Sequence, residues 1–216
     1  MILNDLLIKV IYIIIILVYI IKMNDNNKIQ IVAFSTNDKE ATPNDIMTTF
    51  LSFYAHKMIK KSKTVIAFSM EFPDSNVETK IMICSILNLT KDYSGITDVN
   101  CYVLVVHLEK EDVASKLEEI LQYMKEYCDE TKKIFIIGVT GAKGATQVIT
   151  QKDITNQMEN FGQKYEYHTV KLSDSQDVAD YILQVFMYSK NHLIHQEEED
   201  EADIKDGGQS HSCVIF

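Results

Sequence analysis

The chain has 216 residues, of which 46% are hydrophobic and 24% are charged, as in one ordinary globular domain with terminal extensions. Its net charge of -10 argues against a general nucleic-acid-binding protein, because such proteins present a basic surface. The charge is unevenly placed, since residues 197–206 hold seven acids and one Lys. The four cysteines have neither CxxC nor zinc spacing, so we expect no metal site, no disulfide framework and a reducing compartment.

The first 22 residues form a strongly apolar segment. Between Leu6 and Ile21 the only charged residue is Lys9. This run is short for a membrane span, which takes about 20 apolar residues, and it lacks the basic flank and the cleavage site of a secretory signal. Three interpretations stay open: a short signal anchor, a buried or interfacial helix, or an extension upstream of a true start at Met23 instead of Met1.

From Lys28 onward, strand patterns and helix patterns alternate. Short apolar or alternating runs predict strands at 29–34, 64–72, 78–89, 101–108, 134–138 and 165–172. Apolar residues at helical spacing predict helices at 44–61, 111–127, 151–161 and 177–192. The turn at 73–76 predicts a hairpin between the second and third strands, and Thr150 with Asp153 resembles a capping box.

Strands separated by helices need crossover connections, which favour a mostly parallel sheet covered on both faces. We therefore expect an α/β fold of three layers. It would be doubly wound, with a six-stranded, mostly parallel sheet, one antiparallel strand and about five helices. This domain spans 28–192, after the apolar segment 1–22 and before an acidic tail at 193–216.

The last third of the domain carries a specific resemblance. The strand IFIIG at 134–138 leads into a loop, a helix that ends at Gly162, an aromatic strand, and a helix opened by Asp177 and Val178. Together with the order of elements and the ending Cys213-Val214-Ile215-Phe216, this resembles a Ras-superfamily small GTPase of the Ras or Rab kind. The resemblance implies a P-loop NTPase fold with a site for GTP or GDP and Mg²⁺ at the loops after the strands.

The phosphate loop of that family, G-x-x-x-x-G-K-[ST], corresponds to residues 33–40, where only Lys39 is retained. Asp38 replaces a glycine that lets backbone N–H groups crowd around the phosphates. Glu40 replaces the hydroxyl that would hold Mg²⁺, and with Asp38 it repels a polyphosphate. We interpret Lys39 as a vestigial nucleotide-binding residue or as a solvated loop lysine.

The other three motifs are degraded as well. Asp-x-x-Gly corresponds to Ser-Ile-Leu-Asn at 85–88, and the guanine-reading Asn-Lys-x-Asp corresponds to Val-Thr-Gly-Ala at 139–142. Ala142 has no carboxylate to accept the two hydrogen bonds that guanine would donate. Ser-Ala-Lys falls near Lys-Leu-Ser at 171–173, which does not match. We predict no catalytic residue, and we expect GTP, GDP or Mg²⁺ to bind only if these loops are misaligned.

The last four residues form a prenylation box, in which a terminal Phe favours geranylgeranyl on Cys213. The partners implied are a protein geranylgeranyltransferase and a membrane, on its cytoplasmic face, either the plasma membrane or an internal one. One lipid chain binds only reversibly, so a second contact is needed. The acidic tail cannot supply it to an anionic leaflet, which leaves the apolar N-terminus, a partner protein or a weakly charged membrane.

A small basic cluster, Lys57, Lys60, Lys61 and Lys63, is either a solvated helix end or a contact for a partner or lipid headgroups. The sequence therefore predicts a prenylated, membrane-associated Ras-like protein, a pseudo-GTPase that acts as an adaptor or scaffold in trafficking or signalling. It would bind unknown protein effectors and no nucleic acid. Two alternatives stay open: a divergent small GTPase that binds and hydrolyses GTP, and a single-span membrane protein with a structural cytosolic domain.

Overall fold

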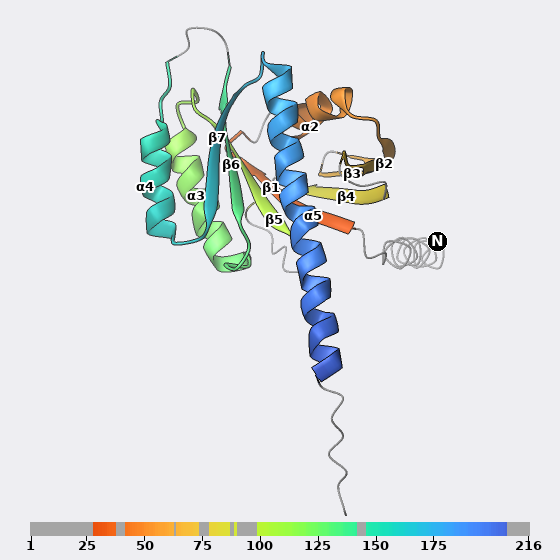
Figure 1. The fold of residues 1–216 in the computed structure, drawn as a ribbon. Coiled ribbons are helices and arrows are strands. Elements are labelled where there is room, and N and C mark those ends of the chain that lie inside the picture. The colour runs from red at the N-terminus through yellow and green to blue at the C-terminus, as the bar shows by residue number, and fades with distance from the viewer. Residues whose placement is uncertain are drawn as a thin grey trace, which may run out of the picture.

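The computed structural model describes residues 28–37, 42–62, 64–73, 78–86, 89, 99–141 and 146–206, without the side chains of 42–45 and 193–206. Seven strands and four helices lie in this part of the chain (Figure 1). They are, in chain order, β1 (Lys28–Ser35), α2 (Thr42–Phe53), β2 (Lys57–Lys61), β3 (Val65–Glu71), β4 (Glu78–Ser85), β5 (Cys101–His107), α3 (Val113–Tyr127), β6 (Ile134–Thr140), α4 (Gln151–Phe161), β7 (Tyr165–Lys171) and α5 (Ser175–Asp206).

The strands form one mixed sheet in the order β2-β3-β4-β1-β5-β6-β7. β1 runs parallel to β4 and β5, and the pairs β5–β6 and β6–β7 are also parallel. β3 runs antiparallel to both of its neighbours, so it is the strand that opposes the rest. The predicted α/β fold with a mostly parallel sheet and a β3–β4 hairpin is confirmed.

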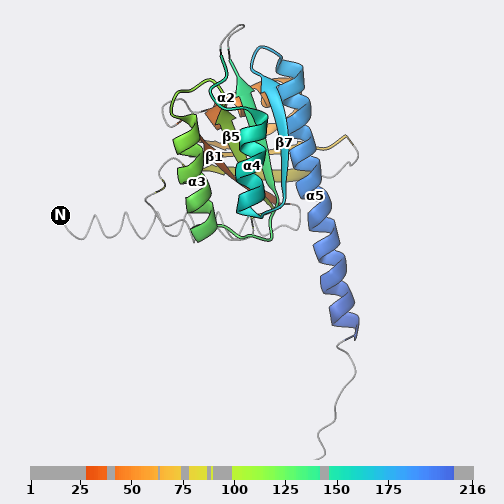
Figure 2. The ribbon, with the colours of Figure 1, turned by 90° about the vertical axis from the view of Figure 1, so that its left-hand side faces the viewer.

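Helices cover the two faces of the sheet in pairs, as the perpendicular views of Figures 1 and 2 show. α2 and α5 pack on one face, where Phe50 and Phe186 join Phe68 of β3 in an apolar core. α3 and α4 pack on the other face, where Leu117 and Met158 join a second core. These two cores hold the strand ends, and therefore the loops that follow them, in fixed relative positions.

The helix predicted over 44–61 is wrong in its second half. α2 ends at Phe53, and Lys57–Lys61 forms the short edge strand β2. Phe53 is 45% exposed and Met58 is 39% exposed, so neither belongs to the apolar face that the spacing indicated. Pairing with β3 overrides the local helical pattern. The sheet therefore has seven strands instead of six, and the described residues hold four helices instead of about five.

The last helix is longer than predicted. α5 runs to Asp206, well into the segment expected to be a tail. The acidic run contains no Gly or Pro before Gly207 and is rich in Glu, so nothing in it breaks a helix.

The strand predicted over 78–89 ends earlier, at Ser85, whereas the start and end of α4 agree closely with the sequence. α4 has the predicted capping box, in which Thr150 and Asp153 bond to each other's backbone, and it ends at Gly162 with a left-handed φ of 82°. Of the helices that the structure describes, none is both long enough and apolar enough to cross a bilayer. The segment 1–22, the prenylation box at Cys213 and the proposed vestigial Lys39 lie outside the described residues.

Candidate functional site

The natural place for a ligand is the edge of the sheet where β4, β1, β5, β6 and β7 end together. After β1 the chain turns to α2 on one face, and after β5 it turns to α3 on the other face. This divergence makes the space beyond β1 and β5 the switch point of the sheet, where open α/β folds usually bind ligands. The family resemblance places the phosphates at the same loop.

Thr36, directly after β1, is joined to β5 at this switch point by two hydrogen bonds. Its backbone N–H donates to the Val105 carbonyl at 3.0 Å. Its Oγ1 accepts from the backbone N–H of His107 at 2.9 Å. Thr36 is only 2% exposed. The loop therefore begins by continuing the β1–β5 ladder instead of opening away from it.

The next residue also turns its backbone donor inward. The N–H of Asn37 donates to Ser35 Oγ at 3.1 Å, and Asn37 is 7% exposed. A phosphate-binding loop needs backbone N–H groups that point at the ligand. The two donors at 36 and 37 are instead used within the protein. To redirect one of them, a ligand would have to break a hydrogen bond worth about 0.5–1.5 kcal/mol.

Backbone hydrogen bonds also hold the end of β4 in the sheet. Ser85, the counterpart of the metal-binding Asp, is buried, and its N–H donates to the Thr64 carbonyl at 2.7 Å. Ile86 is also buried, and its N–H donates to the Ala33 carbonyl at 2.9 Å. This end of the strand offers an apolar side chain and a hydroxyl where the family has a carboxylate. Leu87 and Asn88 lie outside the described residues.

The counterpart of the guanine-reading loop begins inside β6. Val139 belongs to the core beneath α2 and α5, with 2% exposure, and Thr140 Oγ1 donates to the Val170 carbonyl at 3.3 Å. Neither residue reaches toward a base. Ala142 lies outside the described residues.

Glu109 was not predicted as a site residue, although it lies at this loop. A Cβ built on Gly141 would be 2.9 Å from Glu109 Oε2, so the carboxylate rests directly against the glycine. The two residues are 32 positions apart, and only the pairing of β5 with β6 brings them together. No sequence motif marks Glu109, which follows a buried strand without any of the family's signatures.

The end of β7 contributes a helix cap. Asp174 Oδ1 accepts from the backbone N–H of Asp177 at 3.2 Å, at the start of α5. Nearby, His168 Nε2 lies 3.2 Å from Asp177 Oδ1, and its ring stacks on Tyr181 at 4.4 Å. His168 and Asp177 are nine positions apart and meet only across the β7–α5 turn. This pair fastens α5 to the sheet.

The described thiols are poor nucleophiles. Burial raises the pKa of Cys101 to about 12, and burial raises that of Cys128 to about 11. Burial also raises the pKa of Cys84. These cysteines therefore stay protonated near neutral pH. Among the described residues no three His, Cys, Asp or Glu side chains gather as a metal site would require.

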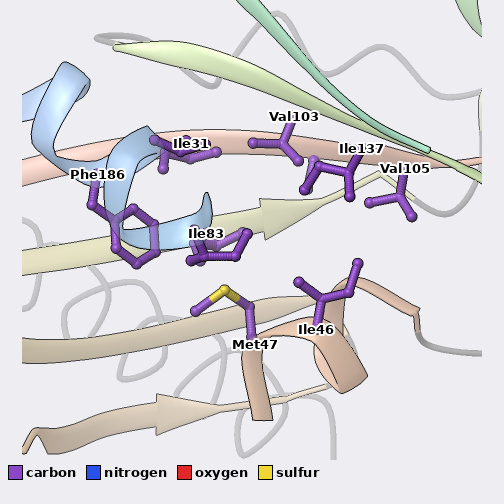
Figure 3. Close-up of a pocket in the computed structure, with 11 residues that line it drawn as sticks. Ile31, Ile46, Met47, Ile83, Val103, Val105, Ile137 and Phe186 are labelled. Atoms are coloured by element: carbon purple, nitrogen blue, oxygen red, sulfur yellow. The ribbon is translucent and has the colours of Figure 1, made fainter. Parts of the chain in front are cut away.

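An apolar cavity lies between α2, α5 and the sheet (Figure 3). Its volume is about 20 Å³, and Ile46, Met47, Ile83 and Phe186 point into it. This volume is close to that of one water, and an all-hydrocarbon lining would leave it dry. The cavity is a small packing defect, with neither the size nor the polarity for a nucleotide.

The basic cluster predicted at 57–63 is an edge strand in the structure. Lys57, Lys60 and Lys61 are exposed on β2, and Lys63 lies outside the described residues.

No protein-family model matches the chain, and no curated protein matches it.

Proposed function

We propose that the chain is a lipid-anchored relative of the small GTPases that acts as an adaptor without binding GTP. The observation that carries this proposal is at the switch point, where the Thr36 N–H donates to the Val105 carbonyl and the Thr36 hydroxyl oxygen accepts from the His107 N–H. A triphosphate needs those positions open and lined with free donors. Closed, the sheet edge serves as part of a rigid scaffold.

The arrangement of the fold supports the family part of the proposal. Strand, helix, hairpin, and then strands alternating with helices follow one another in the order that the resemblance implies. β2 is an addition at the edge of the sheet, beyond the hairpin. The lipid part of the proposal rests on the sequence Cys213-Val214-Ile215-Phe216.

A second candidate, a divergent nucleotide-binding GTPase, is favoured by Glu109 alone. Its carboxylate lies against Gly141, at the loop where the family reads guanine. A carboxylate there could accept two hydrogen bonds from a guanine edge, and such a bidentate contact is worth about 1–3 kcal/mol. In that case Glu109 would replace the aspartate missing at Ala142.

Calorimetric titration of the full chain with GTP and GDP, with and without Mg²⁺, separates the two candidates. If the chain is an adaptor, we expect no saturable heat of nucleotide binding. A working GTPase would bind GTP or GDP with a Kd of about 1 μM or tighter. Glu109→Gln sharpens the comparison. If the second candidate holds, this variant weakens GTP binding and leaves ATP binding unchanged, because only guanine presents the donors that the carboxylate reads.

A further inference from the structure

A row of lysines crosses the sheet on the face opposite α5. Lys57 of β2 pairs with Ser69 of β3, Ser69 pairs with Lys80 of β4, and Lys80 pairs with Lys28 of β1. Residues directly opposite one another on neighbouring strands share a face. Phe68, next to Ser69, lies in the core beneath α2 and α5, so the row lies on the other face.

A β-bulge adds Lys60 to the same face. The register shifts between Met58 and Lys60, so that Lys60 pairs with Ala67, on the same side as Ser69. In a regular strand Lys57 and Lys60 would lie on opposite faces, because they are three residues apart. The extra residue in the bulge turns both to one side, as bulges commonly do.

The thiol of Cys84 lies within the electrostatic reach of lysines from two different strands. Burial raises the pKa of Cys84, while Lys28 and Lys60 act to lower it. The charges from β1 and β2 therefore reach the same half-buried side chain of β4. We call Lys28, Lys57, Lys60 and Lys80 the basic face.

On this side of the sheet, α3 and α4 pack over β5, β6 and the second half of β1, whose Val32 and Phe34 join their core. In the described part of the chain, the core beneath α3 and α4 takes no residue from β2, β3 or β4. In Figure 2 these two helices stand in front of the part of the sheet that includes β1, β5 and β7. Lys57 and Lys60 are exposed, and Lys28 and Lys80 are partly buried. The basic face is thus a charged surface on a chain whose net charge is -10.

The acidic counterpart is the end of α5. This helix continues past the sheet, clear of its own domain (Figure 1). Residues 193–206 extend about 21 Å at 1.5 Å per residue. Within them, residues 197–206 carry seven acids and one Lys, over a length of about 15 Å. The basic face spans three strand spacings, about 14 Å, so the two match in length. They are also opposite in sign, because the four lysines outnumber Glu71 and Glu78, the two carboxylates that β3 and β4 place on the same face.

We propose that the basic face binds the acidic end of α5 from a second copy of the chain. Each copy carries both surfaces, so a reciprocal exchange between two copies would give a symmetric dimer. The helix cannot fold back onto its own basic face, because α5 packs on the opposite face of the sheet and runs unbroken to Asp206. Association in trans follows from this geometry.

Sedimentation velocity of the full, unlipidated chain in non-ionic detergent tests the dimer. We expect a dimer in about 0.1 M NaCl and a dissociation constant at least about tenfold weaker in about 0.5 M NaCl, because the screening length falls from about 10 Å to about 4 Å. Lys57→Glu with Lys60→Glu should leave a monomer at both salt concentrations. The matched control, Lys125→Glu with Lys152→Glu, changes the net charge equally on exposed positions of α3 and α4 and should keep the dimer.

Reversing the charges on both surfaces tests whether the dimer can be restored. Glu197→Lys with Glu201→Lys should by itself abolish the dimer, and mixing this variant with Lys57→Glu/Lys60→Glu should restore a mixed dimer. A dimer that survives Lys57→Glu/Lys60→Glu would overturn the proposal. A monomeric wild-type chain in about 0.1 M NaCl would also overturn it. If that monomer binds phosphatidylserine vesicles through Lys57 and Lys60, the basic face is assigned to a membrane.

Discussion

Thr36 and Val105 are joined across the switch point of the sheet by a backbone hydrogen bond of 3.0 Å. The bond extends the β1–β5 ladder one residue past the end of β1, into the loop that would have to open for a phosphate. The Thr36 hydroxyl reinforces it by accepting from His107. The closed edge is therefore held by both the backbone and the side chain of one buried residue.

Replacing that side chain tests how firmly the edge is held. Thr36→Val keeps the shape but removes the acceptor, which leaves the buried His107 N–H without its bond. We expect a loss of about 1–3 kcal/mol in the free energy of unfolding, measured by urea denaturation. The same change at exposed Thr146 should have almost no effect, and equal effects at the two positions would contradict the assigned role.

Gly138 leaves space for the side chain of Tyr167 because it has no side chain of its own. A Cβ at this position would collide with the Tyr167 hydroxyl and ring of the adjacent strand. We expect Gly138→Ala to destabilise the protein by about 1–3 kcal/mol through overpacking. Adding Tyr167→Phe removes the nearest atom, so the double variant should lose less than the sum of the single ones. Strict additivity in thermal or urea unfolding would show that the two residues do not collide.

The capping box of α4 makes stability depend on pH in the acidic range. Hydrogen bonds from the hydroxyl and the backbone N–H of Thr150 lower the pKa of Asp153 below its ordinary value of 3.8. A carboxyl with a lowered folded pKa stabilises the protein above pH 3.8, and this contribution disappears as the pH falls through the folded pKa.

To test this pH dependence, the midpoint urea concentration of unfolding is compared between about pH 5 and about pH 3. Asp153→Asn should lower the midpoint at pH 5 and reduce the further loss on acidification. Glu159→Gln, at an exposed position of the same helix, should leave the pH dependence as in the wild type. A wild-type slope that survives Asp153→Asn would assign the pH dependence to other carboxyls.

Cys213 should decide membrane attachment. Cys213→Ser removes the nucleophile for the isoprenoid, so we expect the chain to leave the membrane fraction of fractionated cells. Phe216→Ser should keep the chain on the membrane but change its dependence from geranylgeranyltransferase to farnesyltransferase, as inhibitors of each enzyme would reveal. Unchanged membrane recovery of Cys213→Ser would point instead to residues 1–22.

Much of the fold was predictable because its signals are local. The apolar runs that became β1, β5 and β6 are buried on both faces, and Thr150 and Asp153 predict the start of α4 within one turn. The break between α2 and β2 was not predictable in the same way. Apolar residues keep helical spacing as far as Met58, and pairing with β3 is what ends the helix.

The features that matter most for the site arise from long-range pairing. Glu109 reaches Gly141 only because β5 and β6 are neighbours, and Thr36 meets Val105 only because β1 lies beside β5. Lys57 and Lys60 share a face only because of a bulge, whereas their spacing alone would separate them. The degraded motifs predict a changed site, and the contacts of Thr36 and Asn37 show how the loop after β1 begins.

The most direct test of the account is the nucleotide content of the full chain, purified rapidly without chelators, denatured, and analysed by chromatography for guanine nucleotides. The closed switch point predicts no GDP or GTP above the level recovered from an unrelated protein carried through the same steps. Release of about one guanine nucleotide per chain would contradict the account, because only a site with open donors holds its ligand through purification.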